Sequence, residues 1–144
     1  MGITDPTEEY FKDGAWGWDG TRWRKLALVW GYTDTLRLSV SDDDSAAGTI
    51  NLITGSVPAG EIWVVQLAQI NDRSSAATRL EVQVRNGGLV MTLVVDYSPV
   101  ADHVALQAGQ WVLAEGEFLS FWFLGVTLHD NIEGYVAGYK MKVT

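Results

Sequence analysis

From Leu36 to the end of the chain, hydrophobic and polar residues alternate with a period of two, which is the repeat of a β-strand. The stretch 78–86 is the clearest case, because leucine and valine alternate there with arginine, glutamate and glutamine. No segment has a convincing helical repeat. The pattern predicts about eight strands, at 36–40, 48–54, 61–71, 78–86, 89–97, two short pieces at 104–106 and 110–113, 117–126 and 134–143.

This spacing of strands and turns predicts an all-β fold, and a jelly-roll-like β-sandwich is the architecture that suits it best. Another sandwich or a small barrel stays open as an alternative. The longest predicted strand follows the turn Pro58-Ala59-Gly60 and runs to Asn71. We expect the strands after it to pair with it or to face it.

The N-terminal part has a different character and predicts an arm, so the chain divides into an arm at 1–32 and a sandwich at 33–144. Asp5-Pro6 has the signature of a short helical turn, and Asp19-Gly20 predicts a hairpin between aromatic-rich segments. Four of the seven tryptophans lie in this arm: Trp16, Trp18, Trp23 and Trp30. They could form a small core of their own, contact another protein or subunit, or stack on sugars.

The stretch 117–126 is apolar on both predicted faces. One face carries Phe118, Trp122, Leu124 and Val126, and the opposite face carries Leu119, Phe121 and Phe123. A sandwich needs only one apolar face per strand, so we expect the second face to be covered by the arm or by another subunit. The sequence therefore predicts a homo-oligomer, with a trimer as the specific expectation, and an interface formed by Trp16, Trp18, Trp23, Trp30, Leu119, Phe121 and Phe123.

Composition excludes several classes of partner. The 144 residues suit one domain, and the absence of cysteine excludes disulfides and cysteine-based zinc sites. The net charge is −8, and the longest basic cluster is Arg22 to Lys25, so direct binding to nucleic acid is not expected. No apolar run approaches the ~20 residues that span a bilayer, so no membrane partner is expected.

No catalytic set is visible, and the sequence predicts neither an enzyme nor a cofactor. His103 and His129 lie in turn-like stretches without the spacing of a two-histidine metal site. The acids Asp42, Asp43 and Asp44 could attract calcium, but they lack the alternating spacing and the turn glycine of a calcium loop. We therefore expect no catalytic, cofactor or metal site.

Two stretches resemble structural proteins of tailed bacteriophages. Trp18-Asp19-Gly20-Thr21-Arg22-Trp23-Arg24-Lys25-Leu26 resembles a W-D-G-T-x-W-x-K-L segment of tail, fibre and other virion proteins. Val57-Pro58-Ala59-Gly60-Glu61-Ile62-Trp63, with the later turn at Ala108-Gly109, resembles the jelly-roll domain of phage structural proteins. Together these stretches and their strands cover most of the chain.

The resemblance implies a non-enzymatic virion protein, most simply a capsid decoration or cement protein. Such a protein would oligomerise and dock by its arm on the major capsid protein or on other virion subunits. It would be located in the virion, which is assembled in the host cytoplasm. The alternative is a tail-associated or receptor-binding jelly roll that binds carbohydrate. That alternative requires exposed tryptophan or tyrosine side chains grouped in one concave patch.

Overall fold

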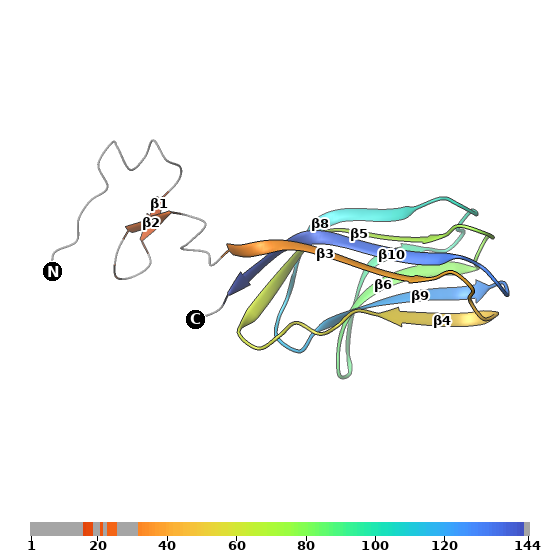
Figure 1. Ribbon diagram of the computed structural model, residues 1–144, viewed down its shortest axis with the longest axis horizontal. Helices are drawn as coiled ribbons and strands as arrows, with labels where there is room; N and C mark the ends of the chain where they lie inside the picture. Colours follow the sequence, from red (N-terminus) through yellow and green to blue (C-terminus); the bar gives the residue numbers. More distant parts are fainter. Residues whose placement is uncertain (1–15, 19–20, 22, 26–31, 143–144) are drawn as a thin grey trace.

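The computed structural model describes residues 16–18, 21, 23–25 and 32–142. From Tyr32 onward these residues form eight strands in two antiparallel sheets that pack face to face (Figure 1). The described residues contain no helix, and hence none long enough to cross a membrane. The predicted all-β sandwich is confirmed.

Each sheet is named here after one of its central strands. The β10 sheet has the order β3 (Tyr32–Asp42), β10 (Ile132–Lys142), β5 (Glu61–Asp72) and β8 (Ala105–Leu113). The β9 sheet has the order β4 (Gly48–Ile53), β9 (Phe118–Val126), β6 (Arg79–Asn86) and β7 (Leu89–Asp96). Apart from the β6–β7 hairpin, consecutive strands lie in opposite sheets, which is the strand order of a jelly roll.

A separate two-stranded sheet precedes the sandwich. β1 (Trp16–Trp18) pairs antiparallel with β2 (Trp23–Lys25), with Trp18 opposite Trp23, which confirms the predicted hairpin. The predicted helical turn near Asp5, the predicted strand through 26–30 and Trp30 lie outside the described residues. The division of the chain into an arm at 1–32 and a sandwich at 33–144 stays a prediction.

The region predicted as two short strands at 104–106 and 110–113 is one strand, β8. The prediction of two strands was wrong because Ala108-Gly109 resembles a turn. Instead, the pairing with β5 shifts in register between the Val65–Trp111 pair and the Leu67–Ala108 pair. The strand therefore passes Gly109 with an irregularity and continues in the same sheet.

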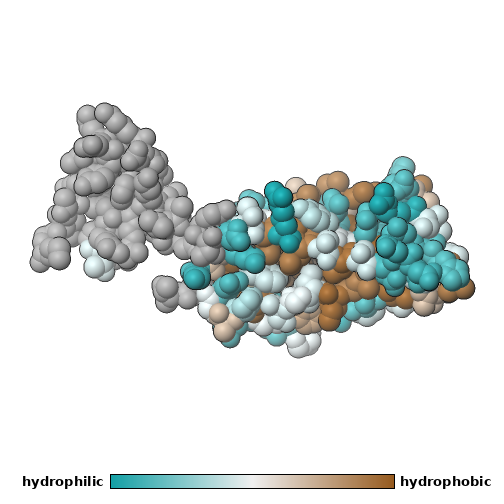
Figure 2. All heavy atoms as spheres, in the orientation of Figure 1, coloured by the Kyte–Doolittle hydropathy of each residue, from teal (hydrophilic) through white to brown (hydrophobic). Residues whose placement is uncertain are grey.

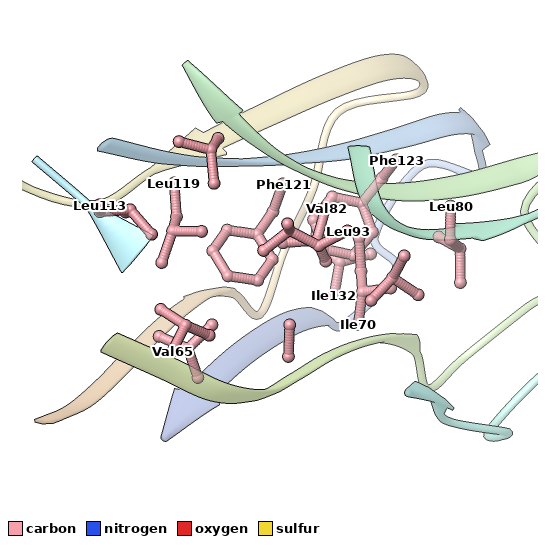
Figure 3. Packing of buried hydrophobic residues seen from close by; sticks show 14 of the residues in the cluster. Val65, Ile70, Leu80, Val82, Leu93, Leu113, Leu119, Phe121, Phe123 and Ile132 are labelled. Carbon is pink, nitrogen blue, oxygen red and sulfur yellow. The ribbon is translucent and has the colours of Figure 1, made fainter. Parts of the chain in front are cut away.

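The core lies between the two sheets, and β9 contributes its largest side chains. Leu119, Phe121 and Phe123 have 0% exposure and project from the β9 sheet toward Val65 and Ile70 of the opposite sheet (Figure 3). Their prediction as a partner interface was therefore wrong. They fill the interior of a single copy, and the outward face of β9 is the one with Phe118, Trp122 and Leu124.

The two faces of β9 were exchanged in the prediction because alternation breaks near its end. Val126 was grouped with the outward residues, but it is 4% exposed and packs in the core cluster. Gly125 has a φ of 71°, and the pairing of β4 with β9 is irregular here. β9 therefore contains one extra residue at this point, as in a β-bulge, and stays in the same sheet. Val126 thus returns to the inner face.

Phe121 also fixes how closely the sheets approach. Its ring packs on the backbone of Gly134 in β10, at the place where any larger residue would carry its Cβ atom. We expect Gly134→Ala to force the ring out of its position and to lower the free energy of unfolding by about 1–3 kcal/mol, as for other overpacked cores. Urea unfolding would measure this loss.

Gly88→Ala serves as the matched control. Gly88 lies in the β6–β7 turn, where an added Cβ atom meets nothing within 4 Å. Its stability should change little or rise slightly. Equal stability of Gly134→Ala and the unsubstituted protein would contradict the packing described here.

Candidate functional site

The outward side chains of the β10 sheet form three rows across the strands. Residues that face each other in neighbouring antiparallel strands point to the same side of the sheet, so the register assigns each row. The rows read Ser39–Tyr135–Gln69–Leu106, Arg37–Ala137–Leu67–Ala108 and Thr35–Tyr139–Val64–Val112. Hydrophobic side chains dominate these rows on three of the four strands.

These three strands carry no charge on the area that they share. β8 contains no charged residue, β5 contains none between Glu61 and Asp72, and β10 contains none between Glu133 and Lys140. We call this area the uncharged surface; it comprises the outward side chains of Leu67, Tyr135, Ala137, Tyr139, Leu106 and Val112. In a chain with a net charge of −8, this absence of charge is typical of a protein contact surface.

The uncharged surface is accessible and most exposed along β8. Leu106 and Val112 are each 57% exposed, whereas Leu67, Tyr135 and Tyr139 are half-buried among their neighbours. Below β8, a groove of about 450 Å³ lies between this strand and β7. Most of the side chains that line the groove are apolar: Leu93, Val94, Val95, Val104, Ala105 and Leu106, with Asp96 and Gln107.

The outer face of the β9 sheet carries a charged network along its inner strand β6, beside the exposed apolar side chains of Ile53, Val90 and Val95 on its two edge strands. Along β6, Arg79 pairs with Glu81, Gln83 donates to Glu81 at 2.6 Å, and Arg85 donates to Gln83 at 3.1 Å. The guanidinium of Arg85 also lies over the Trp122 ring, 5.1 Å from its centroid. Glu81 is only 6% exposed, so this chain of polar side chains is partly buried. Its members bond to one another, although Arg79 Nε is buried without a hydrogen-bond partner.

Polar residues also gather at one end of the sandwich, where loops from both sheets meet. Figure 2 shows hydrophilic residues at this end and hydrophobic residues along the strands. Asp72 is 1% exposed and Asp130 is 4% exposed. Ser75 joins them, because its N–H donates to Asp72 at 3.1 Å and its hydroxyl donates to Asp130 at 2.5 Å.

Burial raises the pKa of Asp72 above its ordinary value of 3.8, and the nearby Asp130 adds to this rise. The N–H groups of Ser75 and Ser74 act in the opposite direction but do not outweigh burial. One carboxylate oxygen of Asp72, Oδ2, is buried without a hydrogen-bond partner. Compared with the unfolded chain, the fold therefore shifts Asp72 toward its protonated form.

Other polar side chains contact the loops between the strands. His129 has a φ of 69° and its Nδ1 contacts Asp44 Oδ1. Glu115 accepts from the N–H of Gly60 at 3.3 Å, and Glu117 accepts from that of Ala114 at 2.8 Å. His103 lies in the β7–β8 loop. Within the described ranges, no three acidic or histidine side chains are grouped so that they could hold a metal ion.

The predicted interface residues are not brought together. Leu119, Phe121 and Phe123 lie in the core, as described above. The backbones of Trp16, Trp18 and Trp23 lie in the β1–β2 hairpin, and Trp30 lies outside the described residues. Prediction missed Leu67, Leu106 and Val112, because only the strand order brings the uncharged segments of β5, β8 and β10 side by side.

Comparison with known proteins was made by sequence and by structure. No family model matches the sequence, and no curated protein matches it. Among solved structures, the chain is similar to the Drosophila NLP core, a nucleoplasmin core whose crystal structure concerns pentamer formation and histone binding. The TM-score is 0.46 with 10% sequence identity, over 76% of this chain and 100% of that chain.

These findings overturn the resemblance to bacteriophage proteins. The solved structure reported above is a nucleoplasmin core and not a virion, capsid or tail protein. The identification as a phage protein was therefore wrong, and so were the capsid decoration function and its carbohydrate-binding tail alternative. The motifs misled for a physical reason: Asp19-Gly20 and Pro58-Ala59-Gly60 are turn signals that antiparallel β proteins share for backbone geometry alone.

The buried carboxyl of Asp72 makes a prediction about pH. Because its folded-state pKa is raised, its contribution to stability is present below about pH 3.8 and is lost as the pH rises through the folded-state pKa. Asp72→Asn removes the charge and keeps an acceptor for Ser74 and Ser75. We expect this variant to be more stable than the unsubstituted protein at pH 7, with a smaller difference at pH 4, in urea unfolding.

Asp43→Asn is the control, since Asp43 is exposed in the neighbouring loop. It should leave the pH dependence of stability unchanged. The contradicting result would be that the stability of Asp72→Asn, relative to the unsubstituted protein, is lower at pH 7 than at pH 4. It would show that the folded state favours the ionised carboxylate.

Proposed function

We propose that this protein is a non-catalytic structural module that assembles with further copies of itself through the uncharged surface. The observation that carries the proposal is the difference between the two outer faces of the sandwich. On the β9 sheet, hydrogen-bonded charged groups occupy the outward positions of β6, an inner strand of that sheet, whereas the β10 sheet presents hydrophobic and aromatic side chains with no charge on three adjoining strands.

The energetic argument favours a covered surface. Burial of an exposed Leu or Val side chain contributes about 1.5–3 kcal/mol, and Leu106 and Val112 are both more than half exposed in a single copy. Tyrosine is also favoured at interfaces because its ring is large and its hydroxyl finds a partner, and this surface holds Tyr135 and Tyr139. Covering Leu106 and Val112 would therefore release water from exposed apolar side chains.

A second copy suits the surface because of charge. Two copies of a chain with a net charge of −8 repel each other, so a stable contact must avoid opposing acids. Several acids lie in or beside the loops at one end of the sandwich, such as Asp43, Asp44 and Asp102. Contact through the uncharged surface brings no like charges together.

The absence of a catalytic role is part of the proposal. The polar groups that could have suggested chemistry are engaged in the turns and in the β6 network. The turn contacts of His129, Glu115 and Glu117 support structural roles for these residues. The trimer expected from the sequence is one of the assembly sizes that the following experiment would identify.

The test compares two glutamate substitutions of equally exposed side chains. Leu106 on β8 and Ile53 on β4 are each 57% exposed, but only Leu106 belongs to the uncharged surface. We expect sedimentation velocity to show a self-associating protein and Leu106→Glu to weaken association by at least about tenfold, because a charge would be buried without a partner. Ile53→Glu should associate as the unsubstituted protein does.

Circular dichroism and urea unfolding would show that both variants remain folded. A protein that is monomeric at every concentration would overturn the proposal. Equal weakening by Leu106→Glu and Ile53→Glu would also overturn it, since the effect would then follow net charge and not the surface.

A further inference from the structure

We infer that β8 pairs with β8 of a second copy, so that the β10 sheets of two copies join into one continuous sheet across a two-fold axis. The inference rests on the proposed function, since it names the part of the uncharged surface where the copies meet. It also names the contact: backbone hydrogen bonds between two edge strands, with side chains of β8 packed above and below them.

β8 is an edge strand with one free side in the sheet. It pairs with β5 from Ile70–Ala105 to Trp63–Leu113, and it is last in the order of the β10 sheet. Among the residues that the structure describes, its N–H and C=O groups on the other side thus have no strand partner in that sheet. Such a row of backbone groups is a template for pairing with another strand.

β8 lacks the features that usually keep edge strands apart. It has nine residues with neither a charged residue nor a proline. Of the other edges, β3 carries Asp34, Arg37 and Asp42, and β4 has only six residues. The fourth edge, β7, carries no charge before Asp96, but its pairing with β6 is irregular at Leu93, near its middle. The irregularity of β8 lies at 109–110, which leaves 105–108 in regular register for pairing.

β8 is also poorly covered within one copy. Every residue from Leu106 to Gln110 is exposed, although alternate residues of a strand in a sandwich normally face the core. The groove of about 450 Å³ between β7 and β8 runs along residues 104–107, so the opposite sheet does not fully cover this part of the strand. A neighbouring strand would cover Leu106 and Gln107 on the two faces.

A second copy of β8 is the partner that these features favour. A strand that pairs antiparallel with its own copy is self-complementary under a two-fold axis, and both copies gain the same hydrogen bonds. An uncharged strand places no like charges opposite each other, which matters in an acidic protein. The outward residues Leu106 and Val112 would then continue the uncharged surface from one copy to the next.

Single cysteines test this contact directly, because the chain contains no cysteine of its own. Leu106→Cys, Gln107→Cys and Ala108→Cys place one thiol each on exposed positions of the regular part of β8. A disulfide between copies requires Cα atoms within about 7 Å, which antiparallel pairing near the axis provides. We expect at least one of these variants to form a covalent dimer in most of the protein under mild oxidation.

Ala137→Cys is the matched control. Ala137 points outward from β10, in the middle of the uncharged surface and two strands away from β8. It should stay uncross-linked when the edges pair. Cross-linking at Ala137→Cys with none in β8 would mean that the sheets pack face to face, which overturns the inference and keeps the proposed function.

Sedimentation of the unsubstituted protein separates the remaining outcomes. An oligomer whose β8 cysteines never cross-link would also overturn the edge contact alone. A monomer at all concentrations would overturn the proposed function together with the inference. Circular dichroism would show that each cysteine variant is folded, so that cross-linking reports on the native structure.

Discussion

The packing of the Phe121 ring on the backbone of Gly134 is the contact on which the rest of the sandwich depends. It sets the distance between the sheets at the centre of the core, and it assigns the inner face of both strands. Once Phe121 points inward, Trp122 must point outward on β9. Once Gly134 faces Phe121, Tyr135 and Ala137 must lie on the outer face of the β10 sheet.

The two outer faces then meet water in different ways. On the β9 sheet, Arg79, Glu81, Gln83 and Arg85 bond to one another, so that polar side chains cover the outward face of β6. On the β10 sheet, no comparable charged chain exists between Glu133 and Lys140 or along β8. The uncharged area of the β10 sheet spans three adjoining strands, whereas charged groups occupy β6 in the β9 sheet, and this difference favours contact through the β10 sheet.

Much of the fold follows from the sequence, because strand alternation and turn signals are local. The β6–β7 hairpin and the long strand β5 lie close to their predicted positions. The faces of β9 could not be predicted, since both are apolar and the added residue at Gly125 reverses the alternation. The candidate surface was missed as well, because Leu67, Leu106 and Val112 come together only through the strand order, which no local pattern contains.

Hydrogen exchange at several protein concentrations tests most directly whether copies meet through the uncharged surface. Backbone amides at an edge exchange slowly only when a partner covers or pairs with them. We predict that exchange in β8 slows as the concentration rises, while exchange in β4, an edge of the other sheet, stays constant. Exchange in β8 that does not depend on concentration, over a range in which the protein associates, would contradict this account.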